Sequence, residues 1–431
     1  MMENEAAWQA LLSRDARFDG VFFVGVSSTG IYCRPVCPVK PPLRRHCHFF
    51  ISAAAAEQAG FRPCLRCRPE LAPGNAPMDQ GGRIAEGILA AIDEGLSCSE
   101  SSVGQLAARF GLSSRQLRRV VQQQLGVSPV ALTQTRRLLL AKQLLTDTQL
   151  PVTDVAFASG FRSLRRFHAA FSDRYRLAPR QLRRQPGGVV GDHVSLLLSY
   201  RPPYDWDAML NFLARRAILH VETIEEKHYL RTVQLGSTTG WIRVGPVVGK
   251  PSLRVDASHS LLPVLPALLG RLRQLFDLAA QPDRIAAQLG RDPTLSASVA
   301  AHPGLRVAGA FDGFELAVRA ILGQQVTVKA ATTLAGRFSD TFGAHIATPF
   351  PALTRLAPPP QRLMAASIDE IAQLGIVSAR ARAIIALAQA MGRGELQLSA
   401  SSDPERTLLQ LMTLPGIGPW TAHYIAMRAL R

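Results

Sequence analysis

The chain has 431 residues, 47% of them hydrophobic, and its 49 Lys and Arg exceed its 32 Asp and Glu, for a formal net charge of +17. These totals exclude a disordered chain and predict three or four domains. No apolar run approaches a membrane span, and the N-terminus, MMENEAAWQALLSRD, is acidic and amphipathic rather than a signal peptide, so we expect a cytoplasmic protein.

The positive charge is uneven. Residues 1–190 carry 25 Lys and Arg against 14 Asp and Glu, and the remainder carries 24 against 18. A protein this basic usually binds a polyanion, most often nucleic acid, although a soluble protein that is merely rich in arginine is the alternative. The N-terminal half is therefore the stronger candidate for nucleic-acid binding.

Five of the six cysteines lie in residues 1–75, in two close pairs and one single position. Cys33 and Cys37, with Cys64 and Cys67, could supply four thiolates to a tetrahedral ion, for which zinc is the default. The simpler interpretation is a structural zinc ion that stabilises a small domain. The alternative is a reactive thiolate, because four thiolates around Zn²⁺ leave about two negative charges and alkylation removes one of them. Cys47 and Cys98 are expected as buried apolar residues.

Residues 83–184 are helical in pattern and contain a repeat, VGQLAARFGLSSRQLRRVV and VTDVAFASGFRSLRRFHAAF. In the first copy Gly111 permits a turn, Ser113 or Ser114 can cap the next helix, and Leu117 and Val120 are expected inside. This is the spacing of a helix-turn-helix, although an ordinary helical hairpin would share it. The second helix of each copy would present side chains to a DNA groove, namely Arg115, Gln116, Arg118 and Arg119, then Ser163, Leu164, Arg165 and His168.

Residues 193–257 alternate between strand and helix patterns. We expect strands at HVSLLLSY, HVETIE, YLRTVQL, GWIRVGP and SLRVDAS, and a helix at WDAMLNFLARRA. Residues 262–431 return to helices, broken by TPFPALTRLAPPPQ. The linkers are LAPGNAPMDQGG and RRQPGGVVGD. Near the C-terminus, Gly416 and Gly418 in LPGIGPW allow a tight hairpin whose backbone N–H groups could reach a phosphate, although a plain turn is the alternative.

The segment GIYCRPVCPVKPPLRRHCHFFISAAAAEQAGFRPCLRCRPE resembles the N-terminal zinc domain of the Ada family. The resemblance implies that all four paired cysteines bind zinc and that Cys33 accepts a methyl group from a methyl phosphotriester in DNA. Loss of negative charge would then tighten DNA binding. Basic residues near the pairs are candidates for phosphate contacts, or else a solvated basic surface: Arg34, Lys40, Arg44, Arg45 and Arg66.

The two helix-turn-helix units, joined by a long helix at about 129–146, resemble the AraC-type DNA-binding domain. This resemblance implies binding to promoter DNA, and RNA polymerase is a candidate partner. The Pro-Cys-His-Arg motif of alkylguanine methyltransferases is absent from the sequence, so that activity is not expected.

From about residue 195 onward, YRPPYDWDAMLNFLARRAILHVETIE, PGLRVAGAFDGFELAVRAILGQQVTVKAA and LPGIGPWTAHYIAMRAL resemble the AlkA family of DNA-3-methyladenine glycosylases. The resemblance implies an α/β domain like half of the TATA-binding protein, followed by a helix-hairpin-helix domain. Gln325 would insert into the duplex, Trp420 and Tyr424 would stack on a flipped cationic base unless they are core residues, and the hairpin could hold a monovalent cation.

The family's catalytic aspartate lies about twenty residues beyond the matching tryptophan, and no Asp or Glu follows Glu405 here. The sequence therefore predicts an incomplete glycosylase domain and a chain that does not excise bases by itself.

The predicted fold class is multidomain α+β: a zinc domain (1–75), an all-α double helix-turn-helix (82–185), an α/β domain (193–300) and an incomplete helical domain (301–431). The predicted function is DNA alkylation response and repair by a monomer that binds damaged and promoter DNA. The rival is a non-enzymatic transcription factor with a structural zinc and a passive glycosylase remnant.

Overall fold

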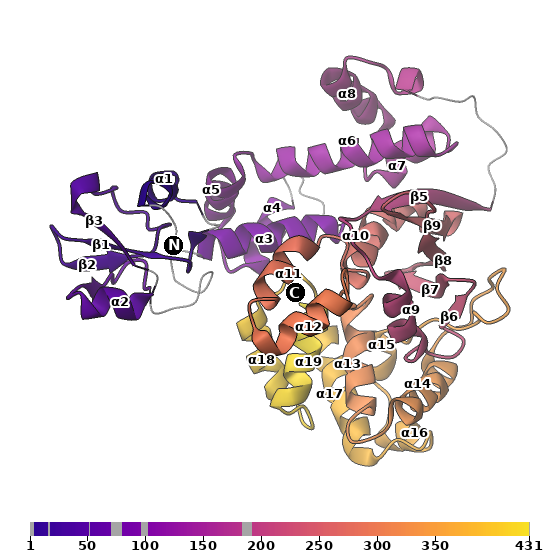
Figure 1. Cartoon of the computed structure of the whole chain (residues 1–431). Helices are drawn as coiled ribbons and strands as arrows, with labels where there is room; N and C mark the ends of the chain where they lie inside the picture. Colours follow the sequence, from indigo (N-terminus) through magenta and orange to yellow (C-terminus); the bar gives the residue numbers. More distant parts are fainter. Residues whose placement is uncertain are drawn as a thin grey trace. The chain divides into compact units, whose positions relative to one another are not determined.

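The computed structural model describes residues 4–15, 18–50, 52–69, 80–95, 102–182 and 192–430. The chain divides into two compact units, residues 1–88 with 107–128, and residues 89–106 with 129–431. Cys98 and nearly all of both predicted linkers lie outside the described residues. Figure 1 labels the helices and strands of both units.

The first unit is built around a small sheet of four strands in the order β3-β1-β2-β4. The strands are β1 (Phe23–Val26), β2 (Ile31–Cys33), β3 (Cys47–Phe50) and β4 (Arg62–Pro63), with α1 (Asn4–Ser13), η2 (Arg44–His46) and α2 (Ala53–Gln58) around them. The parallel pairing of β2 with β4 aligns Ile31 with Arg62 and Tyr32 with Pro63. A separate cluster, including Phe22, Val24 and the predicted buried residue Cys47, forms the apolar core.

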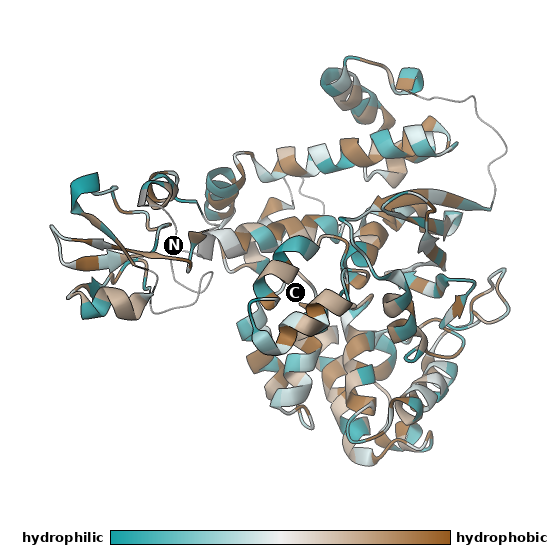
Figure 2. Ribbon diagram, in the orientation of Figure 1, coloured by the Kyte–Doolittle hydropathy of each residue, from teal (hydrophilic) through white to brown (hydrophobic). Residues whose placement is uncertain are grey.

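Helices α3 (Gln80–Asp93) and α4 (Val103–Arg109) cross the boundary between the units, and α5 (Ser114–Leu125) lies in the first unit. In the second unit, α6 (Pro129–Asp147) is the long connecting helix that the sequence predicts, followed by α7 (Val152–Ala158), α8 (Leu164–Tyr175) and η4 (Pro179–Leu182). Brown and teal residues interleave along α6 in Figure 2, because one of its faces is buried, with Leu138, Ala141 and Leu145 inside.

The five strands predicted in residues 193–257 form one antiparallel sheet in the order β5-β9-β8-β7-β6. They are β5 (His193–Ser199), β6 (Glu222–Glu225), β7 (His228–Leu235), β8 (Thr238–Pro246) and β9 (Ser252–Ser258), and the predicted helix is α9 (Trp206–Ala214). The edge strand β5 alternates buried and exposed residues, whereas β7 is buried almost throughout. Asp205 caps α9 by accepting from the N–H of Ala208.

The remaining elements are helical. They are η5 (His259–Val264), α10 (Leu265–Leu275), α11 (Pro282–Leu289), α12 (Pro293–Ala301), α13 (Gly313–Leu322), α14 (Val328–Phe342), α15 (Pro360–Leu363), α16 (Ile368–Ala372), α17 (Ser378–Gly392), α18 (Pro404–Met412) and α19 (Pro419–Ala429). Buried residues of α13, α17 and α19 share one core, which includes Ile321, Leu387 and Ile425. The multidomain α+β class is confirmed. Within the described residues, no helix combines the length and apolarity needed to cross a bilayer.

Candidate metal centre and nucleic-acid interface

The sheet of the first unit brings the two cysteine pairs together. Cys33 ends β2, and a turn closed by Cys37 N–H to Arg34 O (3.1 Å) supplies Cys37. Next to it, Cys64 N–H donates to Tyr32 O (3.0 Å), and a turn after β4 supplies Cys67. The four side chains are buried, and their sulfur atoms all lie within 4.8 Å of one another.

These four sulfurs fit a bound metal ion. Hydrogen bonding to Cys37 and Cys67, followed by burial, raises the pKa of the Cys33 thiol, and the contact with Cys33 lowers the pKa of Cys37 to about 2. Four sulfurs this close together shift one another's pKa, and a cation bound among them would offset the charge of their thiolates. Zn²⁺ prefers four thiolates in a tetrahedron, so the cluster supports the predicted zinc site.

The predicted DNA contact Arg34 is placed differently by the structure. Arg34 is only 1% exposed, and its guanidinium forms an ion pair with Asp19, whose side chain is 9% exposed. The Arg34 backbone N–H also points at Cys67 Sγ (3.4 Å). Arg34 therefore packs against the cysteine cluster and does not face solvent, because its guanidinium is paired with the carboxylate of Asp19. The sequence analysis missed Asp19, which lies fifteen residues away.

The other four predicted phosphate contacts lie at or near the surface. Lys40, Arg45 and Arg66 are exposed. Arg44 is half-buried, with its guanidinium 5.1 Å from the ring centre of Phe49 and 5.8 Å from that of Trp8. These cation–π contacts hold the guanidinium group of Arg44 in a fixed position.

The first predicted recognition helix, α5, exposes all four of its candidate residues, Arg115, Gln116, Arg118 and Arg119. Gln116 also forms a capping box, because its Oε1 accepts from the N–H and from the hydroxyl of Ser113 (both 2.9 Å).

In the second unit, Ser163 caps α8 by accepting from the N–H of Arg166, and Arg165 is exposed. Leu164 and His168 are half-buried, with the His168 ring 5.6 Å from that of Phe167. Phe161, Phe167 and Phe171 are buried and fix the position of the helix.

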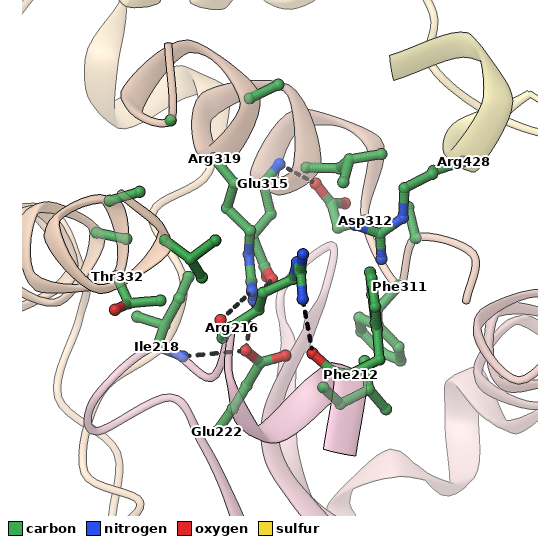
Figure 3. A pocket seen from close by; sticks show the side chains of 18 of the residues that line it. Phe212, Arg216, Ile218, Glu222, Phe311, Asp312, Glu315, Arg319, Thr332 and Arg428 are labelled. Atoms are coloured by element: carbon green, nitrogen blue, oxygen red, sulfur yellow. Dashed lines mark hydrogen bonds and ion pairs between the residues drawn. The ribbon is translucent and has the colours of Figure 1, made fainter. Parts of the chain in front are cut away.

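A cavity of about 220 Å³ opens between β6–β7 and helices α13 and α19 of the second unit (Figure 3). Trp420 and Tyr424 line it with parallel rings, 5.6 Å between centres and 5° between planes. Trp420 is 73% exposed, which excludes core packing as its role. Tyr424 is half-buried, and its hydroxyl accepts from Arg428 (2.7 Å).

Four charged side chains of the cavity wall form a network that the sequence analysis missed. Arg319 donates to Glu222 (2.5 Å) and Glu315 (2.6 Å), and Arg231 donates to Glu315 (2.7 Å). Figure 3 shows Glu222 meeting Arg319 and the N–H of Ile218. Burial opposes ionisation of Glu315, but the nearby guanidinium groups of Arg231 and Arg319 outweigh it and lower the pKa of Glu315 to about 2.

The loop that carries the predicted inserting residue contacts the predicted hairpin. Gln325 is exposed and has a left-handed backbone, φ 52°. Its neighbour Gln324 donates from Nε2 to Gly416 O (2.8 Å) and to Thr421 Oγ1 (3.1 Å). Gly416 has φ 77°, a conformation that glycine adopts freely, whereas Gly418 has φ −82° and caps α19.

Four family profiles match the chain in sequence order. They are the metal binding domain of Ada (residues 6–70), a helix-turn-helix domain (106–185), the AlkA N-terminal domain (195–312) and the HhH-GPD superfamily base excision DNA repair protein (318–414). Fold and matches together define a multidomain protein that joins an Ada-type metal centre to a helix-turn-helix domain and a base-excision-repair fold.

Curated relatives match the chain over all or part of its length. A probable bifunctional transcriptional activator/DNA repair enzyme AlkA of Mycobacterium tuberculosis is 38% identical over 438 residues, covering 99% of this chain and 86% of the relative. DNA-3-methyladenine glycosylase 2 of Escherichia coli is 40% identical over 54% of this chain and 79% of its own length. The bifunctional enzyme Ada of E. coli is 34% identical over 32% of this chain and 37% of its own length. The chain belongs to the family of bifunctional Ada/AlkA transcriptional activator and DNA repair proteins, which confirms the predicted fusion.

Proposed function

We propose that the protein detects and repairs alkylated DNA and that Cys33 is a sacrificial methyl acceptor. The observation that carries this proposal is the buried four-sulfur cluster, in which Cys33 and Cys64 are each 7% exposed while Cys67 is 0% exposed. In the Ada resemblance the acceptor is the first cysteine of the quartet, which is Cys33.

The proposed reaction is a displacement at carbon. A lone pair of the Cys33 sulfur forms the S–CH₃ bond, the CH₃–O bond of the phosphotriester breaks, and its electron pair remains on the phosphate oxygen. The products are a thioether and a phosphodiester anion. Zn²⁺ held by Cys33, Cys37, Cys64 and Cys67 would supply the positive charge that keeps these sulfurs deprotonated. Exposed Lys40, Arg45 and Arg66, with the fixed charge of Arg44, would hold the DNA backbone near Cys33.

We also propose that α5 and α8 bind promoter DNA. The exposed Arg115, Arg118, Arg119 and Arg165 support this, since arginines on a helix suit phosphates and guanine edges. Half-buried His168 and the capping residue Ser163 offer less to a base pair than these exposed arginines.

For the C-terminal half we propose that the cavity beside Trp420 and Tyr424 takes a flipped, electron-poor alkylated purine, with Gln325 inserted in the duplex. The hairpin at Gly416 and Gly418 would contact the backbone, and its carbonyls could hold a monovalent cation. The three carboxylates lining the cavity are engaged: Glu222 and Glu315 with arginines, and Asp312 with Arg271 (2.9 Å). This supports the prediction that residues 1–431 alone do not release methylated bases, which an assay of base release from alkylated DNA tests.

The decisive experiment incubates zinc-loaded protein with DNA carrying methyl phosphotriesters and locates the added methyl by peptide mass spectrometry. A methyl group on Cys33 is expected, lost in Cys33→Ser and kept in Cys47→Ala, which changes a buried cysteine outside the cluster. An unmodified Cys33, with zinc bound and promoter DNA still recognised, would favour the rival transcription factor with a structural zinc. Promoter affinity before and after methylation then tests the switch.

A further inference from the structure

A small apolar cavity lies beside two of the four cysteines. Its volume is about 20 Å³, and Cys33 and Cys37 line it, whereas Cys64 and Cys67 do not. A metal ion held by all four sulfurs would be surrounded by all four residues, so this cavity is separate from the metal position. Its size is enough for one small group.

The walls of the cavity suit an apolar group rather than water. Leu11 of α1 and Val24 and Val26 of β1 line one part of it, all buried, and Val39 with Pro41 and Pro42 lines another. Apart from the two cysteine sulfurs, Arg14 has the one polar side chain among the described residues that line it. A water molecule needs two to four polar partners, which such walls do not offer.

Arg14 connects the two parts of this wall. It follows α1 with φ 49°, and its Nη2 donates to Pro38 O (3.3 Å) and Val39 O (3.2 Å). These two bonds tie the segment after Cys37 to the end of α1, so the cavity has a braced side rather than a loose loop. A braced wall can limit the size of what enters.

We infer that this cavity receives the alkyl group bound to Cys33 and restricts transfer to methyl. This inference rests on the proposed methyl-acceptor function and specifies its substrate. An ethyl phosphotriester would react with the same bond changes, but the ethyl group carries one more methylene. A hydrophobic pocket discriminates one methylene by roughly 10–200-fold in rate.

The test compares methyl and ethyl transfer by the full zinc-loaded chain. Oligonucleotides with one methyl or one ethyl phosphotriester are incubated with protein, and alkylated Cys33 peptide is quantified over time. Leu11→Ala and Val39→Ala enlarge the cavity, while Leu12→Ala is the matched control, since Leu12 is 44% exposed on the same helix. The intrinsic preference of any thiolate for methyl cancels when the methyl-to-ethyl rate ratios are compared between proteins. We expect both enlarged variants to lower this ratio by roughly 10-fold or more, and Leu12→Ala to keep it.

A second readout does not depend on rate. Protein alkylated with a ¹³C-methyl group should give nuclear Overhauser contacts from the S-methyl to methyl groups of Leu11, Val24 or Val26. Zinc content and circular dichroism check folding, and if Leu11→Ala loses zinc, half-buried Val39 decides alone. Methyl on Cys33 with unchanged ratios and no such contacts overturns the cavity's role but leaves the acceptor intact. Absence of methyl on Cys33 overturns both.

Discussion

Two of the buried charged sites among the described residues are neutralised in different ways. Cys33, Cys37, Cys64 and Cys67 offer four ligands of the same sign, so they require a cation that the chain does not supply. Glu222, Glu315, Arg231 and Arg319 contain both signs and neutralise one another. The first site therefore depends on solution conditions such as metal supply, whereas the second depends on the tertiary fold. Removing one component should affect each site in its own way.

The largest expected effect follows removal of zinc. A strong chelator, or Cys37→Ser, should abolish hydrogen-exchange protection of β1–β4, because structural zinc contributes roughly 10–16 kcal/mol to small domains of this kind. Exchange mass spectrometry on the full chain should find β5–β9 and α13–α19 unchanged. Equal loss of protection in both parts would contradict the independence of the two charge sites.

The next largest effect is expected for Glu315→Gln. It leaves Arg231 and Arg319 with one carboxylate between them, and breaking a buried ion pair costs about 3–5 kcal/mol. Urea unfolding monitored at α13 measures the loss. Glu405→Gln, at an exposed position of α18, is the control and should stay within about 0.5 kcal/mol of wild type. A similar loss in both variants would argue against a special role for the network.

The ion-pair network around Glu315 should weaken in acid. The pKa of Glu315 is lowered to about 2 in the folded protein, so its contribution is fully present above the unfolded value near 4.5 and is lost as pH falls towards 2. Unfolding free energies of wild type and Glu315→Gln should therefore converge between about pH 4.5 and 2. If the difference in unfolding free energy between the two proteins stays constant over this range, the charge of Glu315 is not what stabilises the fold.

The smallest effect is expected for Gln324→Ala, which touches neither charge site. It removes two hydrogen bonds that hold Gly416 and Thr421, each contributing about 1 kcal/mol. Binding to undamaged duplex should weaken by roughly 5–30-fold. Exposed Gln361 provides the control, Gln361→Ala, which should bind as wild type does in the same titration.

Structural features that depend on residues close together in the sequence were predictable. The cysteine pairs, the five strands of residues 193–257 and the long helix α6 depend on neighbouring residues or on simple periodicity. The prediction of the buried face of α5 was wrong by one residue, because Val121 is fully buried and the predicted Val120 is not. Both positions fit the helical period, since they lie three and four residues after Leu117.

Features that join distant residues were not predictable. Arg34 has the sequence context of a surface cation, yet its guanidinium pairs with Asp19, and Glu222 meets Arg319 across 97 positions of sequence. No local pattern marks such partners, because each charge alone is compatible with solvent. The hydrogen bonds from Arg14 to the carbonyls of Pro38 and Val39, and those from Gln324 to Gly416 and Thr421, also join residues far apart in the sequence.

The capping box of α5 limits what Gln116 can offer to a base pair. Reading adenine takes an amide that donates to N7 and accepts from the N6 amino group. The Oε1 of Gln116 already accepts twice from Ser113, which uses both of its lone pairs, so only the amino hydrogens remain. If α5 lies in the major groove as proposed, Gln116 can address acceptor-rich edges such as that of guanine while the cap holds, and reading adenine would require the first turn of α5 to open.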